Sequence, residues 1–143
     1  MIDIANLQRK FEIDVEAIRR FVGQATTAVI EARGKQVSVA FVSDRRMKEL
    51  NKVFRNKNAT TDVLSFPYEK EGFEPESSFI GDIVISAEQA NRQAQENGLT
   101  LETEIKQLIL HGLLHICGFN HEADNGEMDR RELGLRSELK IVD

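Results

Sequence analysis

The segment HGLLHICGFNH, residues 111–121, contains all three histidines of the chain. Apolar residues around the first two recur at helical spacing, so His111 and His115 should leave one face of a helix, one turn apart. Two imidazoles placed in this way can bind one metal ion. Gly118 tolerates the positive φ that ends a helix, so the chain can turn back there and bring His121 to the same ion.

The complete pattern, H-x-x-x-H-x-x-G-x-x-H, has the ligand and turn spacing of the metzincin proteases. Three protein ligands with an open fourth position are typical of catalytic zinc sites, whereas structural sites usually have four ligands. Zinc is the natural metal for three imidazoles, although nickel, copper and iron also bind them. We therefore predict one zinc ion held by His111, His115 and His121. Because zinc makes its bound water acidic, hydrolysis is the default chemistry.

Gly112 stands where a zinc protease of the H-E-x-x-H type has its general base, glutamate. Glycine inside a helix costs about 1 kcal/mol relative to alanine. We therefore expect a closely packed backbone, or less commonly substrate, to occupy the space beside it. Without that glutamate a metallopeptidase is the less favoured interpretation. Cys117 should point about 200° away from His115 around the helix, so we interpret it as a core residue rather than a fourth ligand.

A basic segment lies between Asp44 and Lys57, although the whole chain has a net charge of −5. Its six basic and two acidic residues give a local charge of +4. A helix over 44–55 would carry four of these cations in one stripe: Arg45, Lys48, Lys52 and Arg55. The opposite face would carry Met47, Leu50, Val53 and Phe54. For Arg45 and Lys48 a solvated face is the more common role, whereas Arg55 could hold a phosphate in a bidentate manner.

The elements that position these residues can be read from periodicity and capping signals. Strands are expected near Ile2 and Ile4 and over 37–43, 62–67 and 80–86. Besides the helix over 44–55, helices are expected from Asp14 to Gly34, from Ser86 to Gly98, from Thr100 to Gly118 and from Asp124 onward. Residues 69–78 should form a surface loop. The order βαβαββααα predicts an α+β fold, with helices packed on a small mixed β-sheet and a zinc-binding helix-turn with H-x3-H-x5-H.

Length and composition favour one intracellular domain spanning residues 1–143. No apolar stretch follows a basic start, so we expect no secretory signal. The most apolar run has about twelve residues, which is too short for the roughly 18 of a membrane span. The single cysteine is compatible with a reducing compartment. We expect a cytoplasmic protein with no membrane partner.

Three blocks in this order resemble the YbeY endoribonucleases, zinc-dependent factors of ribosomal RNA maturation: LNKVFRNKNATTDVLSFP (50–67), IGDIVIS (80–86) and HGLLHICGFNH (111–121). The resemblance implies a single YbeY-like metal-dependent hydrolase domain in which His111, His115 and His121 bind zinc. It also implies a functional role for Arg55. The implied activity is single-strand-specific endoribonuclease cleavage in small-subunit ribosomal RNA maturation and ribosome quality control. The implied partners are precursor ribosomal RNA and the ribosome or small-subunit assembly factors.

Asn120 departs from the family's common G-[YF]-D-H ending, and asparagine cannot accept a proton as aspartate does. The general base is therefore open. The nearby candidates are Asp62, Asp82, Glu122 and Asp124, for each of which capping or salt bridging is the more common role. We assign catalytic roles to Arg55 and to His111, the latter also as a zinc ligand. Two alternatives are a ribosome-assembly RNA-binding factor with a mainly structural zinc and, less favoured, a metallopeptidase.

Overall fold

The computed structural model describes residues 3–69, 78–120 and 122–141. The strands are β1 (Asp3–Asn6), β2 (Gln36–Val42), β3 (Val63–Pro67) and β4 (Phe79–Ser86). The helices are α1 (Val15–Ala28), α2 (Asp44–Arg55), α3 (Ala87–Glu96), α4 (Leu101–Ile116) and α5 (Glu127–Glu138), with a 3-10 turn η1 (Ile30–Ala32) after α1. This order confirms the predicted succession of strands and helices.

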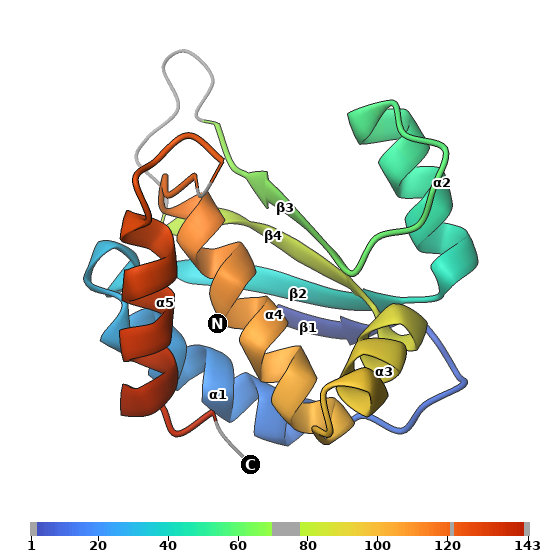
Figure 1. Cartoon of the computed structure of the whole chain (residues 1–143), viewed down its shortest axis with the longest axis horizontal. Helices are drawn as coiled ribbons and strands as arrows, with labels where there is room; N and C mark the ends of the chain where they lie inside the picture. The colour runs from blue at the N-terminus through green and yellow to red at the C-terminus, as the bar shows by residue number, and fades with distance from the viewer. Residues whose placement is uncertain (1–2, 70–77, 121, 142–143) are drawn as a thin grey trace.

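The four strands form one mixed sheet in the order β1-β2-β4-β3 (Figure 1). β1, β2 and β4 run parallel, whereas β3 is antiparallel to β4 and lies at the sheet's edge. The backbone groups of Asp62 and Tyr68 bond to β4. By the alternation of an antiparallel ladder, Val63 and Ser65 therefore direct their backbone groups toward the free edge. The α+β architecture with a small mixed sheet is confirmed.

The two faces of the sheet pack against different helices. Val39 and Phe41 of β2 belong to the main core, which includes side chains from α1, α3, α4 and α5. Val42 instead packs with Met47 of α2 and Leu64 of β3 in a second, smaller cluster. Neighbouring residues of a strand point to opposite faces, so α2 covers the face of the sheet that the other helices leave open.

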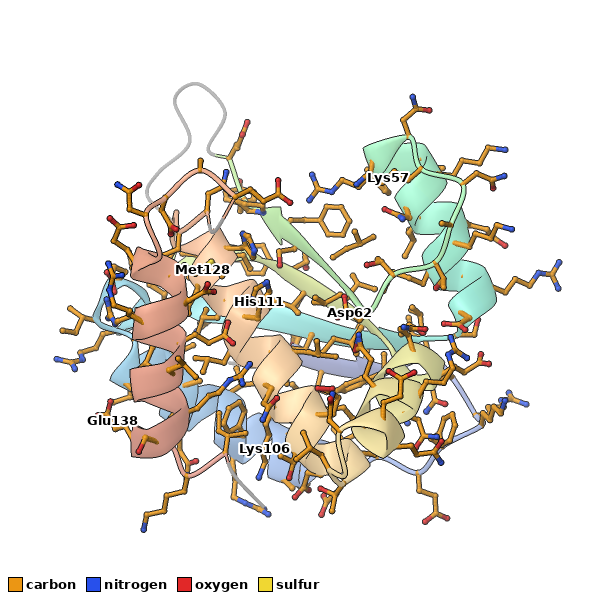
Figure 2. The ribbon with its side chains drawn as sticks, in the orientation of Figure 1. Lys57, Asp62, Lys106, His111, Met128 and Glu138 are labelled. Carbon is orange, nitrogen blue, oxygen red and sulfur yellow. The ribbon has the colours of Figure 1, made fainter. Side chains whose placement is uncertain are left out.

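α4 is the central helix of the main core, and it is buried on most of its circumference. Thr100 caps its start by accepting the backbone N–H of Thr103, and Gly118 follows its end with a φ of 98°. Both predicted signals are confirmed. Figure 1 shows α4 crossing in front of the sheet, with α5 beside it. The side-chain view in Figure 2 shows His111 on α4 near the centre of the molecule.

One sequence prediction for α1 and one for α2 are wrong. α1 does not continue to Gly34: it ends at Ala28, because Val29 adopts an extended conformation and the following turn buries Val29 and Ala32 completely. On α2, Val53 and Phe54 were predicted to share the buried face with Met47. They are 74% and 58% exposed, and the second cluster contains only Met47 and Leu50 from α2.

Two of the remaining capping predictions agree with the structure, but the last helix, expected from Asp124, begins at Glu127 and has Gly126 as its N-cap, without a side-chain cap. The Asp14 side chain accepts the N–H of Ala17 and caps α1, while Ser86 accepts that of Gln89 and caps α3. In the part of the chain that the structure describes, no helix has the length and apolar character that crossing a membrane requires. Most of the loop expected over 69–78, and His121 of the predicted zinc site, lie outside the described residues.

Candidate functional site

His111 and His115 converge from one face of α4. Their Nε2 atoms are 3.2 Å apart and their ring centroids 4.7 Å apart. Two nitrogens bound to one tetrahedral zinc ion at 2.0–2.1 Å would be separated by about 3.3 Å. The two imidazoles are therefore spaced as ligands of a single ion. His121 is not described, and the described residues contain no group of three histidines, cysteines or carboxylates that could hold a metal.

A buried carboxylate holds the other side of the His111 ring. Nδ1 of His111 lies 2.7 Å from Oε1 of Glu132 on α5, which is 7% exposed. The second Glu132 oxygen accepts a hydrogen bond from Arg136, one helical turn further on. A carboxylate at Nδ1 favours the tautomer that keeps the Nε2 lone pair available, as behind metal-binding histidines in general.

The charge on Glu132 is maintained by these two partners. Burial by itself raises the pKa of this carboxyl, but the hydrogen bonds and charges of His111 and Arg136 outweigh it and hold the pKa below its ordinary value. Glu132 is therefore an ionised acceptor at neutral pH. Sequence reasoning missed this residue. The available signal was a carboxylate at the helical spacing of Met128 and Leu135, on the apolar face of α5.

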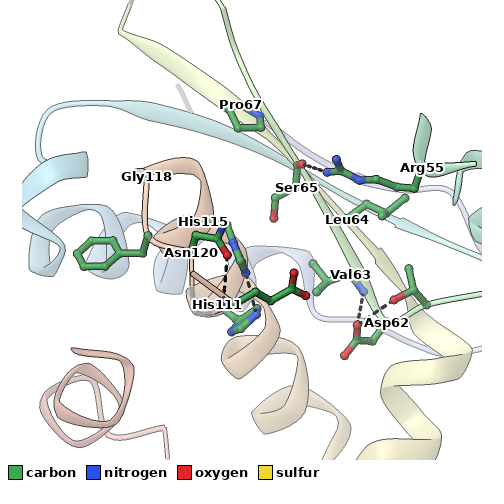
Figure 3. Close-up of a pocket in the computed structure, with 13 residues that line it drawn as sticks. Arg55, Asp62, Val63, Leu64, Ser65, Pro67, His111, His115, Gly118 and Asn120 are labelled. Carbon is green, nitrogen blue, oxygen red and sulfur yellow. Dashed lines mark hydrogen bonds between the residues drawn. The ribbon is translucent and has the colours of Figure 1, made fainter. Parts of the chain in front are cut away.

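A cleft of about 650 Å³ extends from the histidines to the end of α2 (Figure 3). It is lined by Arg55, Thr61, Asp62, Val63, Leu64, Ser65, Pro67, His111, His115, Gly118, Phe119, Asn120 and Glu122. Arg55 reaches over the edge strand, where its Nη2 donates to the backbone oxygen of Ser65 at 2.9 Å. The structure thus brings Arg55 into the same cleft as the two described histidines, from the opposite wall.

Gly112 is explained by close packing of side chains. A Cβ placed there would lie 3.0 Å from Oγ of Ser65 and 3.1 Å from Cγ2 of Ile83. The neighbours are side chains of β3 and β4 rather than backbone or substrate, which corrects the expectation of a packed backbone. A glutamate at this position would extend into the sheet, so the protease arrangement is excluded here by sterics as well as by residue type.

The four carboxylates considered as bases have different surroundings. Asp62 lines the cleft, but its Oδ1 accepts the backbone N–H of Val63 at 2.7 Å. Asp82 is hydrogen-bonded to Ser38 on β2, and it does not line the cleft. Asp124 accepts the N–H of Met128 at 3.0 Å near the start of α5. Glu122 is exposed at the rim of the cleft.

Asn120 and Cys117 have structural contacts. Oδ1 of Asn120 accepts the backbone N–H of Glu122 at 3.1 Å, a turn contact that needs an acceptor and not a base. The Asn120 amide supplies that acceptor. Cys117 packs partly buried against the main core, and burial raises the pKa of its thiol. This surrounding agrees with the interpretation of Cys117 as a core residue.

Residues 3–140 match the family model described as Endoribonuclease YbeY. Endoribonuclease YbeY of Syntrophus aciditrophicus is 39% identical over 127 residues, covering 88% of this chain and 79% of that protein. The protein of the same name from Nautilia profundicola is 38% identical over 141 residues, covering 99% and 93%. The solution structure of TM1509 from Thermotoga maritima has a TM-score of 0.65 at 27% identity and covers 97% of this chain and 89% of that one.

Proposed function

The chain belongs to the YbeY endoribonuclease family, and from this premise we propose that it is a zinc-dependent endoribonuclease specific for single-stranded RNA. It acts in the cytoplasm in maturation of small-subunit ribosomal RNA and in ribosome quality control. Its partners are precursor ribosomal RNA and the ribosome or small-subunit assembly factors. His111, His115 and His121 are its zinc ligands, one ion per chain.

One observation carries the proposal: two imidazoles spaced for one ion and a guanidinium group line the same cleft from opposite walls. Metal-assisted cleavage of a phosphodiester can use both parts. The histidine wall holds a metal, and the arginine wall holds the negative charge of the phosphodiester. The cleft is open, which suits a chain-like substrate rather than an enclosed small molecule.

The residues of the chain have distinct tasks in this site. Bound zinc would supply a Lewis acid and make a water molecule acidic at neutral pH. Glu132 keeps the His111 ring oriented with Nε2 toward the cleft. The Arg55 guanidinium has five N–H donors, and its hydrogen bond to Ser65 uses one of them. The others can bind phosphate oxygens and offset the negative charge that grows on them in the transition state.

Two alternatives use the same residues differently. In a ribosome-assembly factor, zinc would be structural and the basic residues of α2 would bind RNA without cleaving it. A metallopeptidase would need a base next to the first histidine, and the packing of Gly112 against Ser65 and Ile83 leaves no room for one. Cleavage of RNA, rather than binding alone, distinguishes the proposal from the first alternative.

Parallel assays on casein and on a fragment of small-subunit ribosomal RNA test the proposal. We expect the purified protein to cleave unpaired regions of the RNA, to leave casein intact and to lose its activity in chelator. His115→Ala, purified in the same way, controls for contaminating nuclease. Peptidase activity that disappears with the zinc would contradict the proposal, and so would RNA cleavage that His115→Ala retains in full.

A further inference from the structure

Aromatic side chains gather on the side of β3 that faces α2. The chain has eight phenylalanines and one tyrosine, and four of these nine residues form two contacting pairs here. Phe54 of α2 meets Phe66 of β3 with ring centroids 5.2 Å apart, edge to face. Tyr68 meets Phe79 of β4 at 5.7 Å. Phe66 and Tyr68 are two residues apart on an extended chain, so they face the same side.

Phe54 remains accessible although it belongs to this group. It is 58% exposed, and its neighbour Val53 is 74% exposed. Single exposed apolar residues are common in proteins, but Phe54 differs from such residues in two respects. Its ring is held in place by Phe66, and its chain neighbour Arg55 lines the cleft. Arg55 Cζ lies 5.8 Å from the centre of the same Phe66 ring.

The segment that carries Phe54 is positively charged. Among the six basic residues between positions 44 and 57, Arg45 and Arg46 are paired with Glu49. Lys48, Lys52 and Lys57 form no salt bridge with the described residues, and all three are exposed. Figure 2 shows Lys57 at the far end of α2. An exposed aromatic ring that is packed on a second ring, next to an arginine in a basic segment, is a combination that suits single-stranded nucleic acid.

We infer that Phe54 is a stacking platform for an unpaired base of the RNA substrate, next to the phosphate that Arg55 holds. This inference rests on the proposed function, and it extends the substrate site from the cleft, over the free edge of β3, onto the C-terminal end of α2. Lys57, which follows the end of the helix, binds a flanking phosphate. The platform selects for single strands, because a base paired within a duplex has both of its faces covered by neighbours.

Fluorescence anisotropy with a labelled, unstructured twelve-nucleotide RNA and with its duplex tests the inference, using the full-length protein as purified. A denaturing gel after each titration verifies that the RNA is intact. Phe54→Leu keeps apolar bulk without the ring, and Phe54→Tyr keeps the ring. Leu133→Ala on α5 is the matched control, because Leu133 is also an exposed apolar side chain, at 63%. Melting temperatures verify that every variant is folded.

Stacking contributions measured by alanine substitution correspond to about a five- to hundredfold change in affinity. We expect Phe54→Leu and Phe54→Ala to bind the single strand at least fivefold more weakly and the duplex within twofold of wild type. Phe54→Tyr and Leu133→Ala should bind both RNAs like wild type. Equal losses of affinity for the single strand and for the duplex would overturn the inference, because stacking on an unpaired base would then not explain the effect of the substitution.

Wild-type affinity in both Phe54→Leu and Phe54→Ala would also overturn it while leaving the proposed function intact. If those variants bind RNA normally but change the oligomeric state in gel filtration, the ring is a protein contact and the inference is wrong. A wild-type protein that binds neither RNA would contradict the proposed function itself. The two failures are therefore distinguishable.

Discussion

The two walls of the cleft are built in opposite ways. The histidine wall belongs to α4, the most buried helix of the main core, and His111 is held from behind by Glu132 and Arg136. The opposite wall is the C-terminal end of α2, where Val53 and Phe54 are exposed and Arg55 donates a hydrogen bond to the edge strand. A metal ligand needs a fixed position, whereas a surface that binds a long, variable polymer needs access.

α2 itself repeats this contrast between its two ends. Asp44 at its start accepts hydrogen bonds from Thr60, Ser86 and Arg92, which join the helix to β4, α3 and the loop before β3. Burial raises the pKa of Asp44, but these three partners outweigh it and hold the pKa below its ordinary value. The anchored start fixes the direction of the helix, so its far end can present side chains without being buried.

Removing a ligand from the histidine wall should have the largest effect. We expect His115→Ala to reduce zinc from about one ion per chain to a small fraction and RNA cleavage by more than a hundredfold. The reason is that this substitution removes one of the two imidazoles that are spaced for a common ion. Elemental analysis of the purified protein measures the metal content, with Leu133→Ala as control. If His115→Ala keeps one zinc ion per chain, the histidine wall is not the metal site and the contrast between the two walls is wrong.

Arg55 gives the next largest effect, on the open wall. Arg55→Ala should lower the single-turnover cleavage rate on the order of a hundredfold, as loss of a preorganised donor to the transition state does elsewhere. Stability should change by only about 0.5 kcal/mol, because the side chain is at the surface. Arg55→Lys keeps the charge without the planar fork, so its rate should be intermediate.

The measurements for Arg55 are cleavage rate, zinc content and melting temperature on the same preparations. A large loss of zinc in Arg55→Ala would mean that the two walls are not functionally separate. Cleavage at the wild-type rate, with zinc in place, would mean that Arg55 belongs only to a solvated helix face.

Replacing Glu132 should lower the affinity for zinc more than it lowers the stability of the fold. Replacing carboxylates behind a ligand histidine typically costs ten- to a hundredfold in metal affinity or activity. We expect a loss in this range for Glu132→Gln, which keeps an acceptor for His111 but not the charge. Competition with a chelator of known zinc affinity measures it, and Glu138→Gln on the exposed side of α5 is the matched control. Equal zinc affinity in both variants would show that the support is unnecessary.

Lys48 should give a smaller effect, on RNA binding alone. Lys48→Ala removes one exposed cation of the basic segment, so we expect binding to weaken modestly and similarly for all sequences. The plot of log affinity against log salt concentration has a negative slope, and its magnitude should become smaller by about one. Titrations at three or more salt concentrations measure this slope. An unchanged slope would place Lys48 outside the RNA-binding surface.

We expect the smallest effect from replacing Glu104, which lies on α4, the helix of the histidine wall. The effect is on thermal stability. Its burial, and then the charge of Asp62, raise the pKa of this carboxyl. The ionised form is therefore less favourable in the folded than in the unfolded chain. The free energy of unfolding falls as the pH rises from the ordinary pKa of a glutamate to the raised pKa of Glu104. Glu104→Gln should raise the melting temperature at pH 8 and leave it nearly unchanged at pH 4. The opposite pH dependence would mean that the environment of Glu104 favours its charge.

Sequence reasoning was most accurate where the signal is local. The caps at Asp14, Ser86 and Thr100, and the end of α4 before Gly118, depend on hydrogen bonds within one turn of the chain. The mixed sheet followed from the order of the elements. Convergence of His111 and His115 followed from helical geometry, because residues four apart share a face.

The errors and omissions depend on contacts between distant segments. Phe54 has the spacing of a buried residue on α2, but its exposure depends on which side chains of other elements pack against it, and the second cluster does not include it. Glu132 contacts His111 across 21 residues, and helical spacing within α5 does not reveal its partner. Gly112 was recognised as unusual, but its neighbours Ser65 and Ile83 come from β3 and β4.

The most direct test of the central claim is RNA cleavage measured against zinc occupancy in a single preparation. The protein is stripped of metal, then titrated with zinc, and the initial rate on an unstructured RNA is plotted against zinc bound per chain. The account predicts negligible cleavage without metal and a linear rise that levels off at one zinc per chain. Cleavage that persists in the metal-free protein, or that is independent of zinc occupancy, would contradict it.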